Sequence, residues 1–240
     1  MSVEAVLFDF GDTLVTTDPS FEYEDCLIQL HKSLTKNKIE VPYEDFKKAH
    51  SEVLDKHYKT RSLEEITFRS ATSRALKCFG YNLSPNDKRI IEAVNAHMQP
   101  FTKARRINQN LNKILQILKR RYRLGIVSNF GHTPTLLKTL EKFDLTKFFD
   151  AVIVSADVGW RKPSRKVFEA ALKALGVSAS EAVFVGDSLR QDIWGARRVG
   201  MRTVLLRKRK RHLREETFGR VKPDMAIKGL NELPNLLLSL

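Results

Sequence analysis

Apolar residues along the chain follow two patterns. Five short apolar runs, at residues 5–8, 124–127, 151–154, 182–185 and 203–206, predict strands that are buried on both faces. Between them, apolar residues recur at helical spacing over residues 107–118, 134–143, 165–175 and 191–199. Strands that alternate with helices of this length predict an α/β fold with a Rossmann-like, doubly wound parallel sheet.

A long helical block interrupts this alternation after the first strand. Between residues 21 and 100, apolar side chains follow helical stripes such as Leu27, Leu30 and Leu34, and no strand is predicted. Within the block, Ser62 with Glu65 three residues later resembles the capping box that begins a helix. We therefore expect a core formed by residues 1–17 and 101–240, with a helical domain of residues 18–100 inserted into it.

Composition narrows the class of protein. With 42% hydrophobic and 29% charged residues, and only 11 Gly and 8 Pro, the 240-residue chain is expected to be globular. The two cysteines, Cys26 and Cys78, cannot form a disulfide framework and are expected to be buried thiols in a reducing compartment. No apolar run is long enough to span a bilayer, and no signal peptide is recognised. The expected location is cytoplasmic, with no membrane partner.

Charge is distributed unevenly. The chain has 42 basic and 28 acidic residues, a net charge of +14, although residues 1–100 alone have a net charge of −3. Part of the positive excess is a run from Arg207 to Arg214 that directly follows the last predicted strand. This run is either a solvated loop or a contact surface for a polyanion.

Acidic residues stand at the ends of two predicted strands. Asp9 closes the first strand just before Gly11, and Asp187 follows the strand at 182–185, five residues before Asp192. Open α/β sheets bind their ligands at the carboxyl ends of the strands. Buried carboxylates are costly there unless they serve a cation or phosphate chemistry. The alternative is ordinary turn chemistry at Asp9 and a favourable helix-start charge at Asp192.

Hydrogen-bond donors stand after two further strands. Ser128 and Asn129 follow the strand at 124–127, and Lys162 stands before Pro163 after the strand at 151–154. A hydroxyl and an ammonium group could both bind phosphoryl oxygens at the ligand edge. Taken singly, Ser-Asn is common in turns, and a lone lysine is usually a surface charge.

In this order, the four segments resemble the motifs of the haloacid dehalogenase superfamily of hydrolases, over residues 3–15 and about 107–227. The helical block resembles the cap domain of that family. The resemblance implies a phosphatase that acts on a small phosphorylated metabolite, with Asp9 as the nucleophile that forms an aspartyl-phosphate. It also implies that Ser128 and Lys162 hold the transferring phosphoryl group, while Asn129 shapes the phosphate pocket.

The resemblance further implies a Mg²⁺ site. Asp9, Asp187 and the backbone carbonyl oxygen of Gly11 would hold the ion, and Asp192 would support it. The physical requirements agree, because phosphoryl transfer to a carboxylate needs an ionised nucleophile and positive charge on the phosphoryl oxygens.

One position departs from the family pattern. Family phosphatases usually carry a second Asp two residues after the nucleophile, which protonates the leaving group, whereas this chain has Gly11 there and Asp12 one residue later. Loss of such acid–base help costs about 10² to 10⁴ in rate, and less for a good leaving group such as an acyl phosphate. Restoring the acid by Gly11→Asp is expected to increase the turnover of alkyl phosphates. Two alternatives stay open: a catalytically weak phosphate-binding or interaction protein, and a 2-haloacid dehalogenase, against which Asp187 argues.

Overall fold

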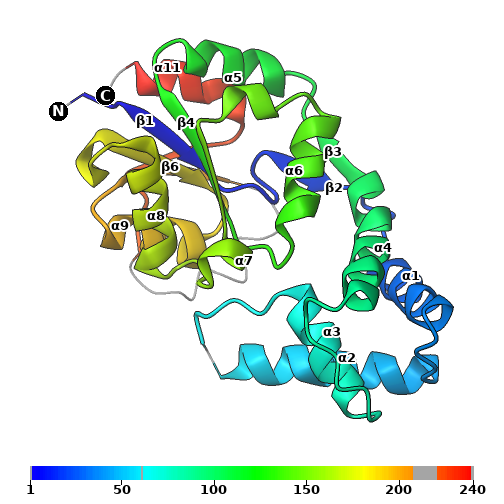
Figure 1. The fold of residues 1–240 in the computed structure, drawn as a ribbon. Coiled ribbons are helices and arrows are strands. Elements are labelled where there is room, and N and C mark those ends of the chain that lie inside the picture. The colour runs from blue at the N-terminus through cyan, green and yellow to red at the C-terminus, as the bar shows by residue number, and fades with distance from the viewer. Residues whose placement is uncertain (1, 61, 208–220, 239–240) are drawn as a thin grey trace.

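A six-stranded parallel sheet forms the centre of the protein in a computed structural model that describes residues 2–60, 62–207 and 221–238 (Figure 1). The strand order is β5-β4-β1-β6-β7-β8, and every pair of neighbours is parallel. The strands are β1 (Ala5–Phe8), β4 (Arg123–Ser128), β5 (Ala151–Val154), β6 (Ala182–Gly186), β7 (Arg202–Leu206) and β8 (Met225–Ile227). The predicted Rossmann-like α/β fold is thus confirmed, and β8 is a strand that the sequence pattern missed.

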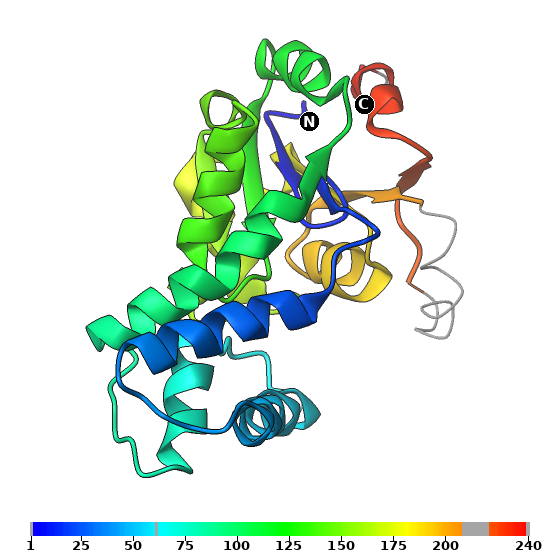
Figure 2. The same cartoon turned by 90° about the vertical axis from the view of Figure 1, so that its right-hand side faces the viewer.

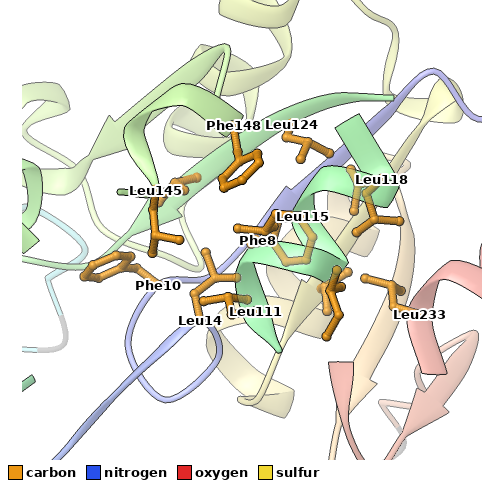
Figure 3. Packing of buried hydrophobic residues seen from close by; sticks show 14 of the residues in the cluster. Phe8, Phe10, Leu14, Leu111, Leu115, Leu118, Leu124, Leu145, Phe148 and Leu233 are labelled. Atoms are coloured by element: carbon orange, nitrogen blue, oxygen red, sulfur yellow. The ribbon is translucent and has the colours of Figure 1, made fainter. Parts of the chain in front are cut away.

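Helices cover both faces of this sheet. The helices of one face are α5 (Leu111–Lys119), α6 (Thr133–Lys142) and α11 (Leu233–Leu237), and those of the other are α8 (Arg165–Leu175) and α9 (Gly195–Arg198). Side chains of β1 alternate between the two resulting cores: Val6 and Phe8 enter the first, and Ala5 and Leu7 the second. Figure 3 shows the first core, where Phe8 lies beneath Leu115 of α5. The remaining short elements are η1 (Thr146–Phe148), α7 (Ser155–Val158), η2 (Ala179–Glu181), η3 (Leu189–Trp194) and η4 (Leu230–Glu232).

Two short antiparallel strands, β2 (Val15–Thr17) and β3 (Arg105–Ile107), link the sheet to the helical insertion. Neither was predicted, because three residues are too few to show a period. Ile107 was expected to begin a helix, which is wrong, since it belongs to β3. The helix starts only at Leu111, after a turn in which the Asn108 side chain accepts a hydrogen bond from the Asn110 amide at 2.8 Å.

Four helices form the insertion: α1 (Tyr23–Lys36), α2 (Tyr43–Lys59), α3 (Phe68–Lys77) and α4 (Lys88–Ala104). Helices α1 and α4 pack side by side, and the insertion lies beyond one end of the sheet in both views (Figures 1 and 2). It has an apolar core of its own, which includes Leu30, Phe46 and Ile90. We propose that it is the cap domain of residues 18–100, with α4 running on to Ala104.

Two local expectations for the insertion are wrong. No helix starts at the Ser62 sequence, because the Ser62 hydroxyl accepts a hydrogen bond from the Glu64 amide within a loop, and the next helix begins after Thr67. Cys26 is buried as expected, but Cys78 is exposed at the end of α3.

The same loop docks the insertion onto the core. The Arg161 amide donates to the Leu63 carbonyl oxygen at 2.7 Å, and the Glu65 amide donates to the Gly159 carbonyl oxygen at 2.9 Å. The insertion is therefore tied to the core through this loop as well as through β2 and β3.

Two further expectations concern the basic run and membrane-spanning segments. The basic run lies outside the described residues except for Arg207, which is exposed. Within the described parts of the chain, no helix is both long and apolar enough to cross a membrane.

Candidate active site

Three neighbouring strands bring the candidate residues to one edge of the sheet. Asp9 follows β1, Ser128 ends β4, and Asp187 follows β6, so adjacent parallel strands place them side by side. Together with Asn129 and Asp192, they line a cavity of about 230 Å³. Residues of the insertion close part of this cavity, so the insertion contributes to the site.

Lys162 does not line this cavity but is the centre of a buried ion-pair network. Its Nζ atom is 2.6 Å from Oδ1 of Asp9 and 2.8 Å from Oδ1 of Asp192, and only 2% of the residue is exposed. Burial lowers the pKa of Lys162, but the attraction of Asp192 and Asp9 outweighs this effect and the net pKa is raised. Lys162 is therefore held as a cation between two carboxylates.

The buried carboxylates outnumber this cation. Oxygen atoms of Asp9, Asp187 and Asp192 all lie within 4.8 Å of one another, so the three carboxylates and Lys162 sum to two negative charges when ionised. Burial raises the pKa of Asp9 to about 6 even though Lys162 lowers it. A divalent cation with a preference for oxygen ligands, such as Mg²⁺, fits this donor set and its net charge.

Asp192 owes its position to a close approach to the end of β6. Its Oδ2 atom accepts a hydrogen bond from the Ser188 amide at 2.9 Å. A Cβ atom on Gly186 would lie only 2.5 Å from the Asp192 side chain, so no larger residue fits there without displacing it. The helix predicted over residues 191–199 begins instead as a π-helical turn, η3, and continues as α9.

Asn129 braces the backbone of Lys162. Its Oδ1 atom accepts from the Lys162 amide at 2.6 Å, and its Nδ2 atom donates to the Lys162 carbonyl oxygen at 3.0 Å and to Oε1 of Gln191 at 3.2 Å. Both amide hydrogens are thus engaged, which leaves none to donate to a phosphoryl oxygen. The contacts make Asn129 a positioning residue for Lys162.

The remaining wall was not predicted from the sequence. It includes Thr17, Tyr23, Phe101, Phe130 and Arg105, and Asp12 also lines the cavity. Three of these residues are aromatic, and Phe101 is stacked on Phe130 at a centroid separation of 5.5 Å. Nothing in the sequence distinguishes Arg105 from the many other basic residues, since only tertiary contacts reveal that it is buried.

Comparison with known proteins agrees with the fold. Residues 6–206 match the family model described as haloacid dehalogenase-like hydrolase. A glyceraldehyde 3-phosphate phosphatase of Pyrococcus furiosus is 32% identical over 205 residues, which is 84% of this chain and 80% of that protein. The solved 2-haloacid dehalogenase of Pseudomonas syringae pv. Tomato DC3000 matches with a TM-score of 0.72 and 25% identity over 99% of both chains. A HAD phosphatase of Thermococcus onnurineus matches with a TM-score of 0.65 and 26% identity over 98% of both chains.

The chain belongs to the haloacid dehalogenase-like hydrolase family. It is a hydrolase whose curated relatives include phosphatases.

Proposed function

We propose that the protein is a Mg²⁺-dependent phosphatase that hydrolyses a small phosphorylated metabolite through an aspartyl-phosphate on Asp9. The observation that carries this proposal is the buried cluster of Asp9, Asp187 and Asp192 around one lysine, at the ligand edge of a parallel sheet. A cavity of about 230 Å³ suits a small substrate. The names of its relatives, such as glyceraldehyde 3-phosphate phosphatase, support the same class.

Each residue has a distinct role in this proposal. Asp9 attacks the phosphorus atom, and Lys162 stabilises the ionised form of Asp9 through their ion pair. The Ser128 hydroxyl donates a hydrogen bond to an oxygen of the transferring phosphoryl group, and Asn129 holds the Lys162 backbone in place.

The proposed metal site completes these roles. Asp9, Asp187 and the Gly11 carbonyl oxygen would hold Mg²⁺, with Asp192 supporting the site. When bound, the ion supplies positive charge that offsets the charge of the carboxylates and the phosphoryl oxygens.

A screen of phosphate esters and acyl phosphates, with Mg²⁺ and with a chelator, tests this function. We expect phosphate release that needs Mg²⁺ and is abolished in Asp9→Asn, because the amide keeps the shape of the side chain but loses the attacking charge. Asp55→Asn is the matched control, since the Asp55 side chain is 70% exposed and lies in the insertion. Chelator-insensitive halide release from 2-haloacids would identify a dehalogenase instead. No hydrolysis of any compound in the panel would favour a phosphate-binding protein.

A further inference from the structure

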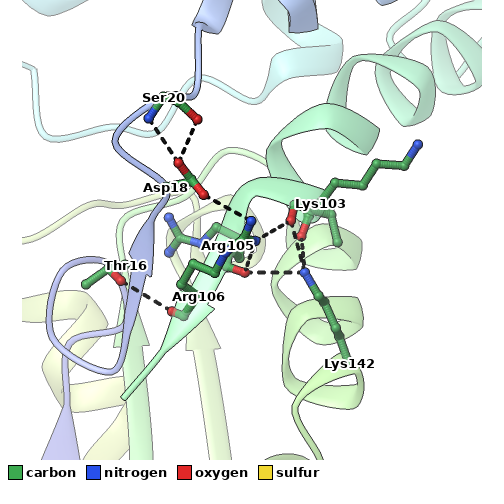
Figure 4. A network of polar contacts seen from close by, with 8 residues as sticks. Thr16, Asp18, Ser20, Lys103, Arg105, Arg106 and Lys142 are labelled. Atoms are coloured by element: carbon green, nitrogen blue, oxygen red, sulfur yellow. Dashed lines mark hydrogen bonds and ion pairs between the residues drawn. The ribbon is translucent and has the colours of Figure 1, made fainter. Parts of the chain in front are cut away.

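Arg105 is a buried cation on the wall of the cavity, at the start of β3 (Figure 4). Only 5% of the residue is exposed. Its Nη1 atom donates to the Thr17 hydroxyl at 2.7 Å and its Nη2 atom to the Val15 carbonyl oxygen at 3.3 Å, while Nε finds no acceptor among the described residues. Arg105 also makes no ion pair with any carboxylate of the described residues. Asp12 and Asp9 attract its charge only at longer range, and burial still lowers the pKa of Arg105, so its charge is only partly compensated.

Such a charge is costly unless a ligand completes it. A guanidinium has five N–H donors and stays protonated, and its burial without a counter-charge costs free energy. Aromatic rings cover its faces: its carbon atom lies 4.7 Å from the Phe101 ring centroid and 5.6 Å from that of Phe10. Because rings cover these faces, a ligand can reach the guanidinium only at its edge, where the unused N–H donor lies.

The guanidinium lies beside the turn that follows the nucleophile. A Cβ atom built on Gly11 would find Nη2 of Arg105 at 4.0 Å, and no other heavy atom outside the neighbouring residues comes closer. In phosphoryl transfer, the leaving oxygen lies opposite the attacking oxygen. Arg105, Tyr23 and Phe101 line the same cavity as Asp9, which places them within reach of a leaving group bound there.

We propose that Arg105 is a catalytic residue that stabilises the departing oxygen as an anion, and that the site selects phosphates with acidic, planar leaving groups, namely aryl and acyl phosphates. This inference rests on the proposed phosphatase function. It follows from three features together: a partly compensated buried guanidinium, a glycine beside it that supplies no acid, and an aromatic wall. A cation lowers the energy of a leaving anion without giving up a proton, which matters most where no acid is present.

The proposed step balances without an acid. A bond forms between an Asp9 carboxylate oxygen and phosphorus while the bond from phosphorus to the leaving oxygen breaks. The electron pair of the broken bond stays on the leaving oxygen, which departs as a phenolate or carboxylate against Arg105. Water then attacks phosphorus and releases inorganic phosphate, which restores the Asp9 carboxylate.

A series of aryl phosphates with leaving groups of graded acidity tests the role of Arg105. The measured quantity is kcat/KM, because it reports the transfer of the phosphoryl group to Asp9 and is independent of later hydrolysis. We expect Arg105→Met to lower kcat/KM about 10²- to 10³-fold for the least acidic phenols and much less for the most acidic ones. The dependence of log kcat/KM on leaving-group pKa should therefore become steeper than in the wild type.

Two further variants keep the test decisive. Arg105→Lys retains the charge but not the forked geometry, and we expect a slope between those of the wild type and Arg105→Met. It also replaces Arg105→Met if that variant does not fold. Arg106→Met is the matched control, because the neighbouring Arg106 side chain is 54% exposed and pairs with Asp18 (Figure 4). Its slope should equal that of the wild type.

Two results would overturn the inference while leaving the phosphatase intact. An equal fractional loss across the whole series would mean that Arg105 only holds β2 and β3 in place, and an unchanged series would mean that it has no role. Both differ from failure of the proposed function itself, in which Asp9→Asn would retain the wild-type rates.

Discussion

An aspartate introduced at position 11 is expected to impair this enzyme rather than restore a general acid. Gly11 does not have a positive φ, and a Cβ atom there has no neighbour closer than Arg105 at 4.0 Å, so a side chain fits. The new carboxylate would face the guanidinium. The sequence alone predicted faster turnover of alkyl phosphates in Gly11→Asp, and the position of Arg105 reverses that expectation.

The strength of the attraction between the new carboxylate and Arg105 follows from the short distance between a Cβ atom at position 11 and Nη2 of Arg105. Two unit charges about 4 Å apart attract by roughly 4 kcal/mol at an effective dielectric constant of about 20. Such an attraction lowers the pKa of the introduced carboxyl well below its usual value and keeps it ionised at neutral pH, so it has no proton to donate. The pair also neutralises the cation that stabilises the leaving group. We expect Gly11→Asp to lower kcat/KM for aryl phosphates by about 10²-fold.

A double-mutant cycle provides the assay. In Gly11→Asp/Arg105→Met the guanidinium is gone, so burial and the nearby carboxylates raise the pKa of the introduced acid and let it donate a proton. Relative to Arg105→Met alone, this double variant should hydrolyse alkyl phosphates about 10²-fold faster or more. Gly11→Ala controls for the added side chain and should unfold at the wild-type temperature. If Gly11→Asp by itself hydrolyses alkyl phosphates faster than the wild type, the reasoning about Arg105 is refuted.

Three other predictions concern stability and metal binding. Three buried histidines have a pKa lowered by burial from 6.5 to about 4 and protonate on unfolding at mildly acidic pH: His50, His97 and His132. The contribution of these histidines to the free energy of unfolding should therefore be complete above pH 6.5 and fall toward pH 4 by at most about 3 kcal/mol for each histidine. Asp9, whose pKa is raised, partly offsets this loss. Equal urea midpoints at pH 7.5 and 5 would contradict the prediction. Gly186→Ala should destabilise the fold by about 1–3 kcal/mol and weaken Mg²⁺ binding, because its Cβ atom would displace Asp192, and an unchanged melting temperature would exclude that clash. Asp187→Asn should reduce apparent Mg²⁺ affinity at least about tenfold in calorimetric titrations, while Asp55→Asn should leave it unchanged; equal affinities would remove Asp187 from the metal site.

The sequence predicted the large elements of the fold because burial dictates their composition. Strand β1 is enclosed by β4 and β6 and covered on both faces, so all four of its residues are apolar and the run is plain in the sequence. The short links β2 and β3 leave no such signature. Their pairing depends on contacts between residues about 90 positions apart, such as Val15 with Ile107. The predicted helix start at Ser62 was wrong for a related reason, because hydrogen bonds to the core fix the loop that contains Ser62.

The candidate site was predictable where it depends on strand ends and hidden where it depends on packing. Asp9, Ser128 and Asp187 each end an apolar run, and parallel topology then brings them together. Arg105 has no comparable signal, because it lies between Ala104 and Arg106 and ends no apolar run, and its burial arises from aromatic residues on other elements. The sequence shows that Gly11 replaces an acid, but it does not show what this replacement does to catalysis.

The effect of Gly11 on catalysis depends on which group lies beside it. If only water lay beside Gly11, the departing oxygen would be solvated by water alone, as expected in a weak enzyme or a binding protein. A buried guanidinium with a spare donor gives the same space a fixed positive charge, which costs free energy in the absence of a ligand and is recovered only when an anion develops there. It follows that Arg105→Met, which removes that cost, should be at least as stable as the wild type if the contacts with Thr17 and Val15 contribute little, and a thermal unfolding measurement decides this. A gain in stability together with a loss of activity would be the expected mark of a charge retained for catalysis, whereas loss of both would assign Arg105 to the structure of the β2–β3 link.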